Sequence, residues 1–197
     1  MGKKKTECGS RPEGGDSVYP GIIDTELMGE NVRGKLKRCG MGVRIYPLAK
    51  IAFPHVVDLD DSCRIRDFVF IFGGTGVRVG KYTDMQPHSV IWGGGEVWIG
   101  DRVSVGPGTV LLTGVYSYKE GLKMVDGLGE GTTNALYGKL TIEDDVYIGA
   151  NCTLMPNVKV GVGAVIGAGS FVNRDIQPWT INVGSPARKI GVRPKES

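Results

Sequence analysis

The sequence predicts an all-β protein whose chain winds into a parallel β-helix of six-residue repeats. Aliphatic residues recur at every sixth position toward the C-terminal end, and the fifth position of each hexad is mostly small or β-branched. The aliphatic positions are Ile142, Ile148, Leu154, Val160, Ile166 and Val172. A period of six is neither helical nor simple strand alternation. It fits a triangular coil in which each hexad makes one strand and one corner, and stacked coils bury the aliphatic side chains.

The same phase continues toward the N-terminus. Coils begin at Cys39, Leu59, Val79 and Ile99. These starts are twenty residues apart, so each of the first three coils has two residues more than three hexads need. In two coils the extra pair accompanies Gly73–Gly74 or the Gly93–Gly95 run, which predicts a bulge. The chain has 32 glycines, and they recur at intervals instead of gathering in linker-like runs, which also favours a repeat architecture.

The repeats divide the chain into three segments. We expect residues 1–38 to form a disordered tail and a small cap, 39–177 to form the β-helix, and 178–197 to form a C-terminal extension. Within the first segment, 1–16 is the expected tail and 17–38 the expected cap.

One long excursion, over residues 115–140, interrupts the fourth coil. Loops of this length in a regular solenoid are usually functional or disordered. This one carries three tyrosines, Tyr116, Tyr118 and Tyr137, together with Asn134 and several acidic residues. We therefore expect it to be functional.

Bulk properties narrow the class of protein. The 197 residues carry a formal net charge of +3, which fits contact with anionic small molecules and does not call for nucleic acid. No apolar stretch is long enough to span a bilayer. The four cysteines, Cys8, Cys39, Cys63 and Cys152, are widely spaced, so we expect a reduced, cytoplasmic protein. Cys63 and Cys152 fall on inward fifth positions and are predicted to be core residues.

The hexads, the long loop and the ending IGAGSFVNRDIQPWTINVGSPARKI resemble the hexapeptide-repeat acetyltransferases, in particular their sugar O- and N-acetyltransferase branch. The resemblance covers about residues 39–193. It implies a left-handed coil, an exception to the usual right-handed crossover. It also implies a homotrimer with sites at the subunit clefts, acetyl-CoA as the acyl donor, and a sugar or nucleotide-linked sugar as the acceptor. The long loop would reach a neighbouring subunit, and no metal is required.

The resemblance places the acetyl-CoA site on the C-terminal coils. The matching positions are Ala150, Gly167, Ala168, Asn173, Arg188 and Lys189. Small residues let backbone groups approach the pantetheine amides, and a terminal arginine can pair with phosphate. Gly167 and Ala168 have an alternative explanation, since coil packing also requires small residues. Arg188 and Lys189 have one too, as part of a solvated tail.

The catalytic base is the least settled part of the resemblance. Many relatives place a histidine after a Thr-Gly in the loop, but here that position is Val115, and the loop contains no histidine. His55 is interpreted as a structural or surface residue. His88 is predicted to lie at a corner facing outward with Asp84 just before it, and these two are the candidate catalytic residues. The candidate substrate-binding residues are Tyr82, Trp92, Tyr116 and Asn134.

A second mechanism needs no enzymic base. An acceptor amine that arrives neutral can attack the thioester directly, and the protein then supplies orientation and an oxyanion-stabilising amide. Because the loop lacks a histidine, we favour an amino group over a hydroxyl as the acceptor. A substrate-binding aspartate of galactoside acetyltransferase aligns with the Gly93–Gly95 run, so simple galactosides are not supported.

Two rival functions remain to be weighed. Carbonic anhydrases of the same fold bind zinc with three histidines, and this chain has two, in coils that are not adjacent. A non-catalytic β-helical scaffold or binding module is the other rival. The missing loop histidine favours that rival, and the long polar loop and the C-terminal motif argue against it.

Overall fold

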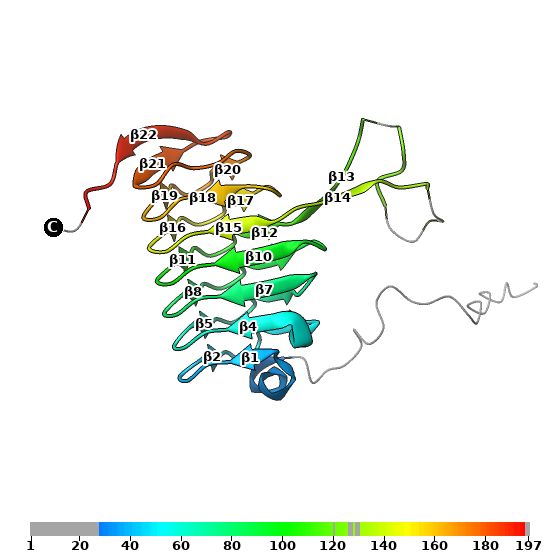
Figure 1. The fold of residues 1–197 in the computed structure, drawn as a ribbon, viewed down its shortest axis with the longest axis vertical. Helices are drawn as coiled ribbons and strands as arrows, with labels where there is room; N and C mark the ends of the chain where they lie inside the picture. The colour runs from blue at the N-terminus through cyan, green and yellow to red at the C-terminus, as the bar shows by residue number, and fades with distance from the viewer. Residues whose placement is uncertain (1–27, 120, 126–127, 129–130, 196–197) are drawn as a thin grey trace, which may run out of the picture.

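The chain folds into a left-handed parallel β-helix of stacked triangular coils (Figure 1). The computed structural model describes residues 28–119, 121–125, 128 and 131–195. The tail expected over 1–16, with Cys8, and the first half of the cap expected over 17–38 lie outside these residues. Each coil adds one short strand to each of three parallel sheets, numbered here 1 to 3 in the order in which a coil visits them.

The strands of each sheet are as follows. Sheet 1 contains β1 (Arg38–Cys39), β4 (Val57–Leu59), β7 (Gly76–Val79), β10 (Glu96–Ile99), β15 (Leu140–Ile142) and β18 (Lys159–Val160). Sheet 2 contains β2 (Arg44–Ile45), β5 (Arg64–Ile65), β8 (Asp84–Met85), β11 (Ser104–Val105), β16 (Tyr147–Ile148), β19 (Val165–Ile166), β21 (Thr180–Val183) and β22 (Arg188–Val192). Sheet 3 contains β3 (Lys50–Ala52), β6 (Phe70–Phe72), β9 (Val90–Trp92), β12 (Val110–Leu112), β17 (Thr153–Leu154) and β20 (Phe171–Val172).

The strand register confirms the repeat arithmetic. In sheet 2, Ile45 pairs with Ile65, Ile65 with Met85, and Met85 with Val105, each twenty residues further along. After the excursion, Ile148 pairs with Ile166, eighteen residues on. Inward positions therefore stack directly on one another from coil to coil.

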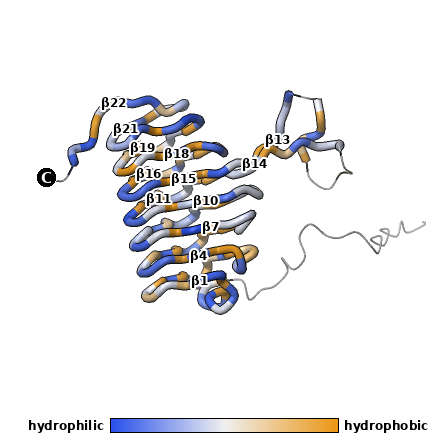
Figure 2. Tube along the Cα trace, in the orientation of Figure 1, coloured by the Kyte–Doolittle hydropathy of each residue, from blue (hydrophilic) through white to orange (hydrophobic). Residues whose placement is uncertain are grey.

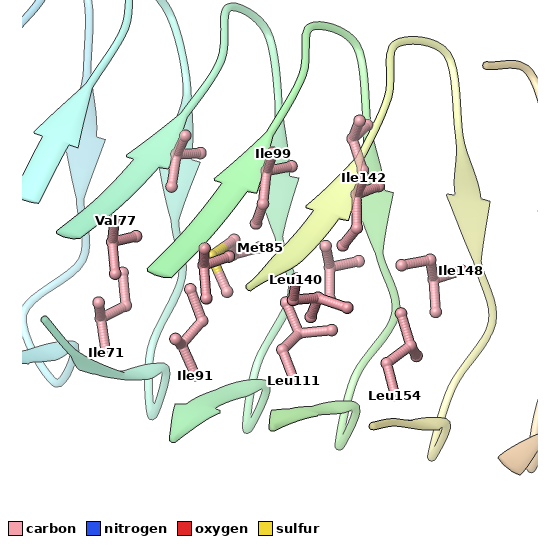
Figure 3. Packing of buried hydrophobic residues seen from close by; sticks show 14 of the residues in the cluster. Ile71, Val77, Met85, Ile91, Ile99, Leu111, Leu140, Ile142, Ile148 and Leu154 are labelled. Carbon is pink, nitrogen blue, oxygen red and sulfur yellow. The ribbon is translucent and has the colours of Figure 1, made fainter. Parts of the chain in front are cut away.

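Aliphatic side chains from the three sheets meet along the axis (Figure 3), where Ile91, Ile99 and Leu111 are fully buried. Apolar and polar residues alternate along each coil (Figure 2), as a chain with one inward face requires. Cys63 and Cys152 are buried in this core, as predicted. Burial raises the pKa of the Cys63 thiol to about 12 and also raises that of Cys152, so both thiols stay protonated at neutral pH.

The extra residues of the twenty-residue coils lie at the corner between sheets 3 and 1, which is hereafter the wide corner. In one coil it holds the 3-10 helix η2 (Pro54–Val56). In the next, the Gly76 N–H donates to the Gly73 carbonyl at 3.0 Å and closes a turn. The predicted bulge is therefore wrong, since these residues build the turn between two strands instead of interrupting one.

Both ends of the solenoid are covered. The 3-10 helix η1 (Gly29–Lys35) buries Val32 at the first coil. At the other end, β21 still pairs in parallel with β19, so the β-helix continues through Val183 and the predicted boundary at 177 is too early. The chain then returns as β22, antiparallel to β21.

Among the described residues, no helix has the length and apolar character that a membrane crossing requires.

The fourth coil opens into an arm, defined here as residues 114–137. Its base is a two-stranded antiparallel sheet of β13 (Gly114–Tyr116) and β14 (Ala135–Tyr137). The arm projects away from the solenoid at the wide corner (Figure 1), and the coil resumes at β15.

Candidate active site

A cavity of about 530 Å³ lies where the arm leaves the solenoid. Its lining comes from three successive coils and from both strands at the base of the arm. The lining residues are Phe53, Phe72, Gly74, Thr75, Trp92, Gly93, Gly94, Gly114, Val115, Tyr116, Ala135 and Tyr137. It is hereafter called the arm pocket.

Aromatic rings stacked by the coil repeat form one wall of the arm pocket. The ring centroids of Phe53 and Phe72 are 5.1 Å apart in an edge-to-face arrangement, and those of Phe72 and Trp92 are 5.3 Å apart. Phe72 and Trp92 end β6 and β9 at equivalent places, and Phe53 lies one residue beyond the equivalent position in β3, so the coil period brings the three rings together. Trp92 remains 51% exposed, which leaves its indole accessible to a ligand. Aromatic faces of this kind bind planar rings and C–H-rich sugar faces.

Glycines allow the arm to approach the coil below it. Gly93 has φ +126°, and a β carbon there would collide with the backbone nitrogen of Gly114. Gly114 begins β13, so the missing side chain sets how closely the arm lies on the solenoid.

The described lining of the arm pocket contains hydroxyl groups and backbone amides but no carboxylate and no imidazole. The hydroxyls belong to Thr75, Tyr116 and Tyr137. His55 is exposed on η2, with its ring centroid 6.3 Å from that of Phe53, which itself lines the pocket. The pocket can therefore orient an acceptor by stacking and hydrogen bonding, without an acid–base side chain among these residues.

The predicted cluster around His88 is not brought together within one chain. Asp84 lies on sheet 2, where its carboxylate accepts two hydrogen bonds from Arg66, at 2.7 and 2.8 Å, and this pair raises the pKa of Arg66. His88 lies at the corner between sheets 2 and 3, hereafter the narrow corner. Its exposed ring stacks on Phe68 with centroids 4.7 Å apart.

The remaining candidates lie elsewhere. Tyr82 is 66% exposed at the corner between sheets 1 and 2, whereas Trp92 and Tyr116 line the arm pocket. Asn134 is next to the lining residue Ala135, and its backbone carbonyl accepts a hydrogen bond from the Ser117 N–H at 2.8 Å. The catalytic role of His88 and Asp84 stays a prediction. Phe53 and Phe72 were not among the predicted site residues, although Phe72 recurs at the phase of Trp92 and Phe53 lies one residue beyond that phase.

Three of the six predicted acetyl-CoA residues, Ala150, Gly167 and Ala168, lie on the narrow corner of the last coils. The Gly169 N–H donates to the Ala150 carbonyl at 2.8 Å, so the corners of Ala150 and Ala168 stack. The segment 184–187 is held beside β20, with the Ala187 N–H donating to the Phe171 carbonyl at 2.8 Å.

Packing explains one of the small residues at this corner. A β carbon on Gly167 would lie 2.6 Å from the Val183 side chain, so the stacking of the coils requires glycine there. Ala168, by contrast, is exposed. Its small size leaves the corner open to a ligand.

Basic side chains continue from this corner to the C-terminal end of the solenoid. Arg188 and Lys189 are exposed on β22 and, with Arg174, line a cleft of about 170 Å³. Asp175 also lines this cleft, so its charged groups are three cations and one carboxylate, and the net positive charge fits a phosphate-bearing ligand. Asn173 is exposed after β20, where the chain turns toward sheet 1. Within the described ranges there is no group of three or more His, Cys, Asp or Glu residues arranged to hold a metal ion.

Several proteins similar to this chain are acyltransferases. Residues 139–174 match the family model described as bacterial transferase hexapeptide (six repeats). The chain is 30% identical to the dTDP-4-amino-4,6-dideoxy-D-glucose acyltransferase of Escherichia coli, over 81% of this chain and 84% of that protein. It is also 30% identical to the bifunctional protein GlmU of Thermotoga maritima, over 86% of this chain but 33% of that longer protein.

A solved structure agrees with these relatives. AntD, an N-acyltransferase from Bacillus cereus in complex with dTDP and 3-hydroxybutyryl-CoA, superposes with a TM-score of 0.74 at 28% identity, covering 81% of this chain and 84% of AntD. The repeat, the arm and these similarities have one explanation. The chain belongs to the hexapeptide-repeat acyltransferases and is a CoA-dependent acyltransferase of their sugar-modifying branch.

Proposed function

We propose that the protein transfers an acetyl group from acetyl-CoA to the amino group of a nucleotide-linked amino sugar. The observation that carries this proposal is the arm pocket, whose described lining offers aromatic faces and hydroxyls but no carboxylate or imidazole. The E. coli relative, named for a dTDP-linked 4-amino sugar, and the N-acyltransferase AntD support an amine acceptor.

The chemistry then proceeds by direct attack. The neutral amine forms a C–N bond with the thioester carbonyl carbon, and the C–S bond breaks as the CoA thiolate leaves. The proton lost from nitrogen passes to that thiolate, which gives an amide and free CoA thiol. A hydroxyl acceptor would instead need a general base. For that case His88, with Asp84, remains the predicted base.

The chain's own residues would bind and orient the two reactants. The small residues Ala150, which is half-buried, and Ala168, which is exposed, leave room for the pantetheine arm along the narrow corner. Arg188 and Lys189 would pair with CoA phosphates at the end of that corner, with Asn173 near the same end. Thr75 and Tyr116 would hydrogen-bond the acceptor in the arm pocket, which fixes the amine for attack.

A homotrimer would bring these surfaces together, because each copy would place its arm against a neighbour. The described part of the arm exposes several apolar side chains, which soluble proteins usually cover with a partner. These are Tyr118, Met124, Val125, Leu128 and Leu136. We place the enzyme in the cytoplasm, where CoA thioesters and nucleotide sugars are both available.

A free-thiol release assay with acetyl-CoA tests the proposal. The acceptor panel contains amino sugars and plain sugars, each free and nucleotide-linked. The proposal expects thiol release that depends on a nucleotide-linked amino sugar. Release only with hydroxyl acceptors would contradict the amine mechanism. Absence of both release and acetyl-CoA binding would favour the non-catalytic scaffold.

A further inference from the structure

The Tyr137 ring packs against glycine residues in the arm pocket. Tyr137 is the last residue of β14 and pairs with Gly114 of β13. The next residue, Gly138, donates its N–H to the Thr113 carbonyl at 2.9 Å, which fixes the strand to the solenoid just beyond the ring. The side chain is still 60% exposed, so its position is defined while its free face remains accessible.

The reason that a side chain is excluded at Gly94 differs from the reason at its two glycine neighbours. Gly93 has a left-handed φ, and a β carbon on Gly95 would collide with the carbonyl oxygen of Gly138, so backbone geometry requires both. The three atoms nearest to a β carbon on Gly94 all belong to the Tyr137 ring, with Cε1 at 2.6 Å and Cδ1 at 2.9 Å. The φ of Gly94 is outside the left-handed region. The aromatic ring is therefore the physical reason for glycine at this position.

Gly114 supports the same ring from the arm itself. A β carbon there would lie 3.1 Å from both Cδ1 and Cε1 of Tyr137, which is tighter than ordinary van der Waals contact. Two glycines from separate segments thus make room for one tyrosine, and any side chain on Gly94 would displace the ring.

We propose that Tyr137 is the specificity-determining residue for the acceptor, and that Gly94 sets its position. This rests on the proposed function. With Phe72 and Trp92 in the same pocket, the ring offers an aromatic surface and no charge to the acceptor. Aromatic faces attract C–H groups and leave sugar hydroxyls without the partners they have in water. The pocket therefore favours an acceptor sugar that carries a methyl group, as in a deoxysugar, over its fully hydroxylated analogue.

Acceptor competition in the full-length protein tests this proposal. The two acceptors are dTDP-4-amino-4,6-dideoxy-glucose, the sugar in the name of the E. coli relative, and the analogue that keeps the hydroxyl at carbon six. The variants are Tyr137→Phe, Tyr137→Ala, Gly94→Ala and the double variant Gly94→Ala/Tyr137→Ala. Gly34→Ala is the matched control, because a β carbon there meets open space. Thermal melting establishes that each variant is folded.

The expected readout is the ratio of kcat/KM for the two acceptors. Tyr137→Phe should keep the wild-type ratio, and Tyr137→Ala should lower it about 5- to 10-fold, as loss of one aromatic contact predicts. Gly94→Ala should also lower the ratio, but should add nothing in the Tyr137→Ala background, because the displaced ring is then absent.

Two outcomes overturn the inference. One is an unchanged ratio in folded Tyr137→Ala while the wild-type protein prefers the deoxysugar. The other is a Gly94→Ala effect that persists without Tyr137. A wild-type protein that neither binds nor acetylates either acceptor would instead overturn the proposed function itself, so the two failures are distinguishable.

Discussion

The carboxylate of Asp84 forms a bidentate salt bridge with the guanidinium of Arg66, with N–O distances of 2.7 and 2.8 Å. The pair joins adjacent coils on the outside of sheet 2. Asp84 is thus occupied as a structural partner, and we expect Asp84→Asn to leave acetyl transfer to an amine within about threefold of wild type. Loss of this partly exposed ion pair should lower the free energy of unfolding by about 0.5–1 kcal/mol, which urea titration measures.

His88 separates the two mechanisms. If the amine attacks directly, His88→Ala should change kcat for an amino acceptor less than about threefold, since no general base is removed. General-base catalysis contributes about 10²–10⁴-fold. A fall in kcat within that range, measured in steady state with saturating acetyl-CoA, would assign the base to His88. Phe68→Ala is the control, because it removes the stacking partner and keeps the imidazole.

Arg188 and Lys189 are predicted to bind the phosphates of CoA. Their joint replacement by alanine should raise KM for acetyl-CoA at least about tenfold and leave kcat nearly unchanged. Charge-assisted hydrogen bonds contribute about 1.5–3 kcal/mol each. Calorimetry with CoA and with dephospho-CoA checks the assignment, because the variant should no longer distinguish the two. An equal loss of affinity for both ligands would place the phosphate elsewhere.

The stacked core predicts a strong contrast between inward and outward leucines. Leu111 is fully buried on the axis, whereas Leu48 is 46% exposed at a corner. Leu111→Ala should lower the free energy of unfolding by about 2–5 kcal/mol because it leaves a cavity. Leu48→Ala should cost less than about 1 kcal/mol. Equal effects in urea titrations would contradict the inward assignment of the hexad.

Acid should destabilise the protein partly through Asp145. The hydrogen bonds from Arg102, the shortest 2.6 Å long, lower the pKa of this carboxyl below its ordinary value of about 3.9. The folded state therefore binds the proton less readily than the unfolded state. The contribution is present above about pH 4 and is lost as the pH falls through the folded pKa.

Arg102→Gln tests this linkage by melting temperature between pH 6 and 2. The variant should lose less stability on acidification than the wild type does. Parallel curves for the two proteins would show that the pair carries no pH dependence.

Local pattern predicted the coil because a side chain's inward or outward direction depends only on its place in the hexad. Cys63, Met85 and Cys152 all fall inward and are buried for that reason. Spacing along one coil was a poorer guide to the site. His88 and Trp92 are four residues apart, yet one turns at the narrow corner and the other faces the arm pocket at the far end of the same strand.

The arm pocket depends on contacts between coils. Phe72 and Trp92 end equivalent strands one coil apart, with Phe53 just after the strand before them, and that signal was present in the sequence. The place of Tyr137 could not be read in the same way. It follows from the antiparallel register of β13 and β14, which the hexad repeat does not determine.

The most direct test of the central claim is the chemical identity of the product. The purified protein is incubated with acetyl-CoA and dTDP-4-amino-4,6-dideoxy-glucose, and the nucleotide sugar is analysed by mass spectrometry before and after treatment with hydroxylamine. The account predicts one added acetyl group that survives hydroxylamine, as an amide does. An acetyl group that hydroxylamine removes, or an unmodified nucleotide sugar, would contradict it.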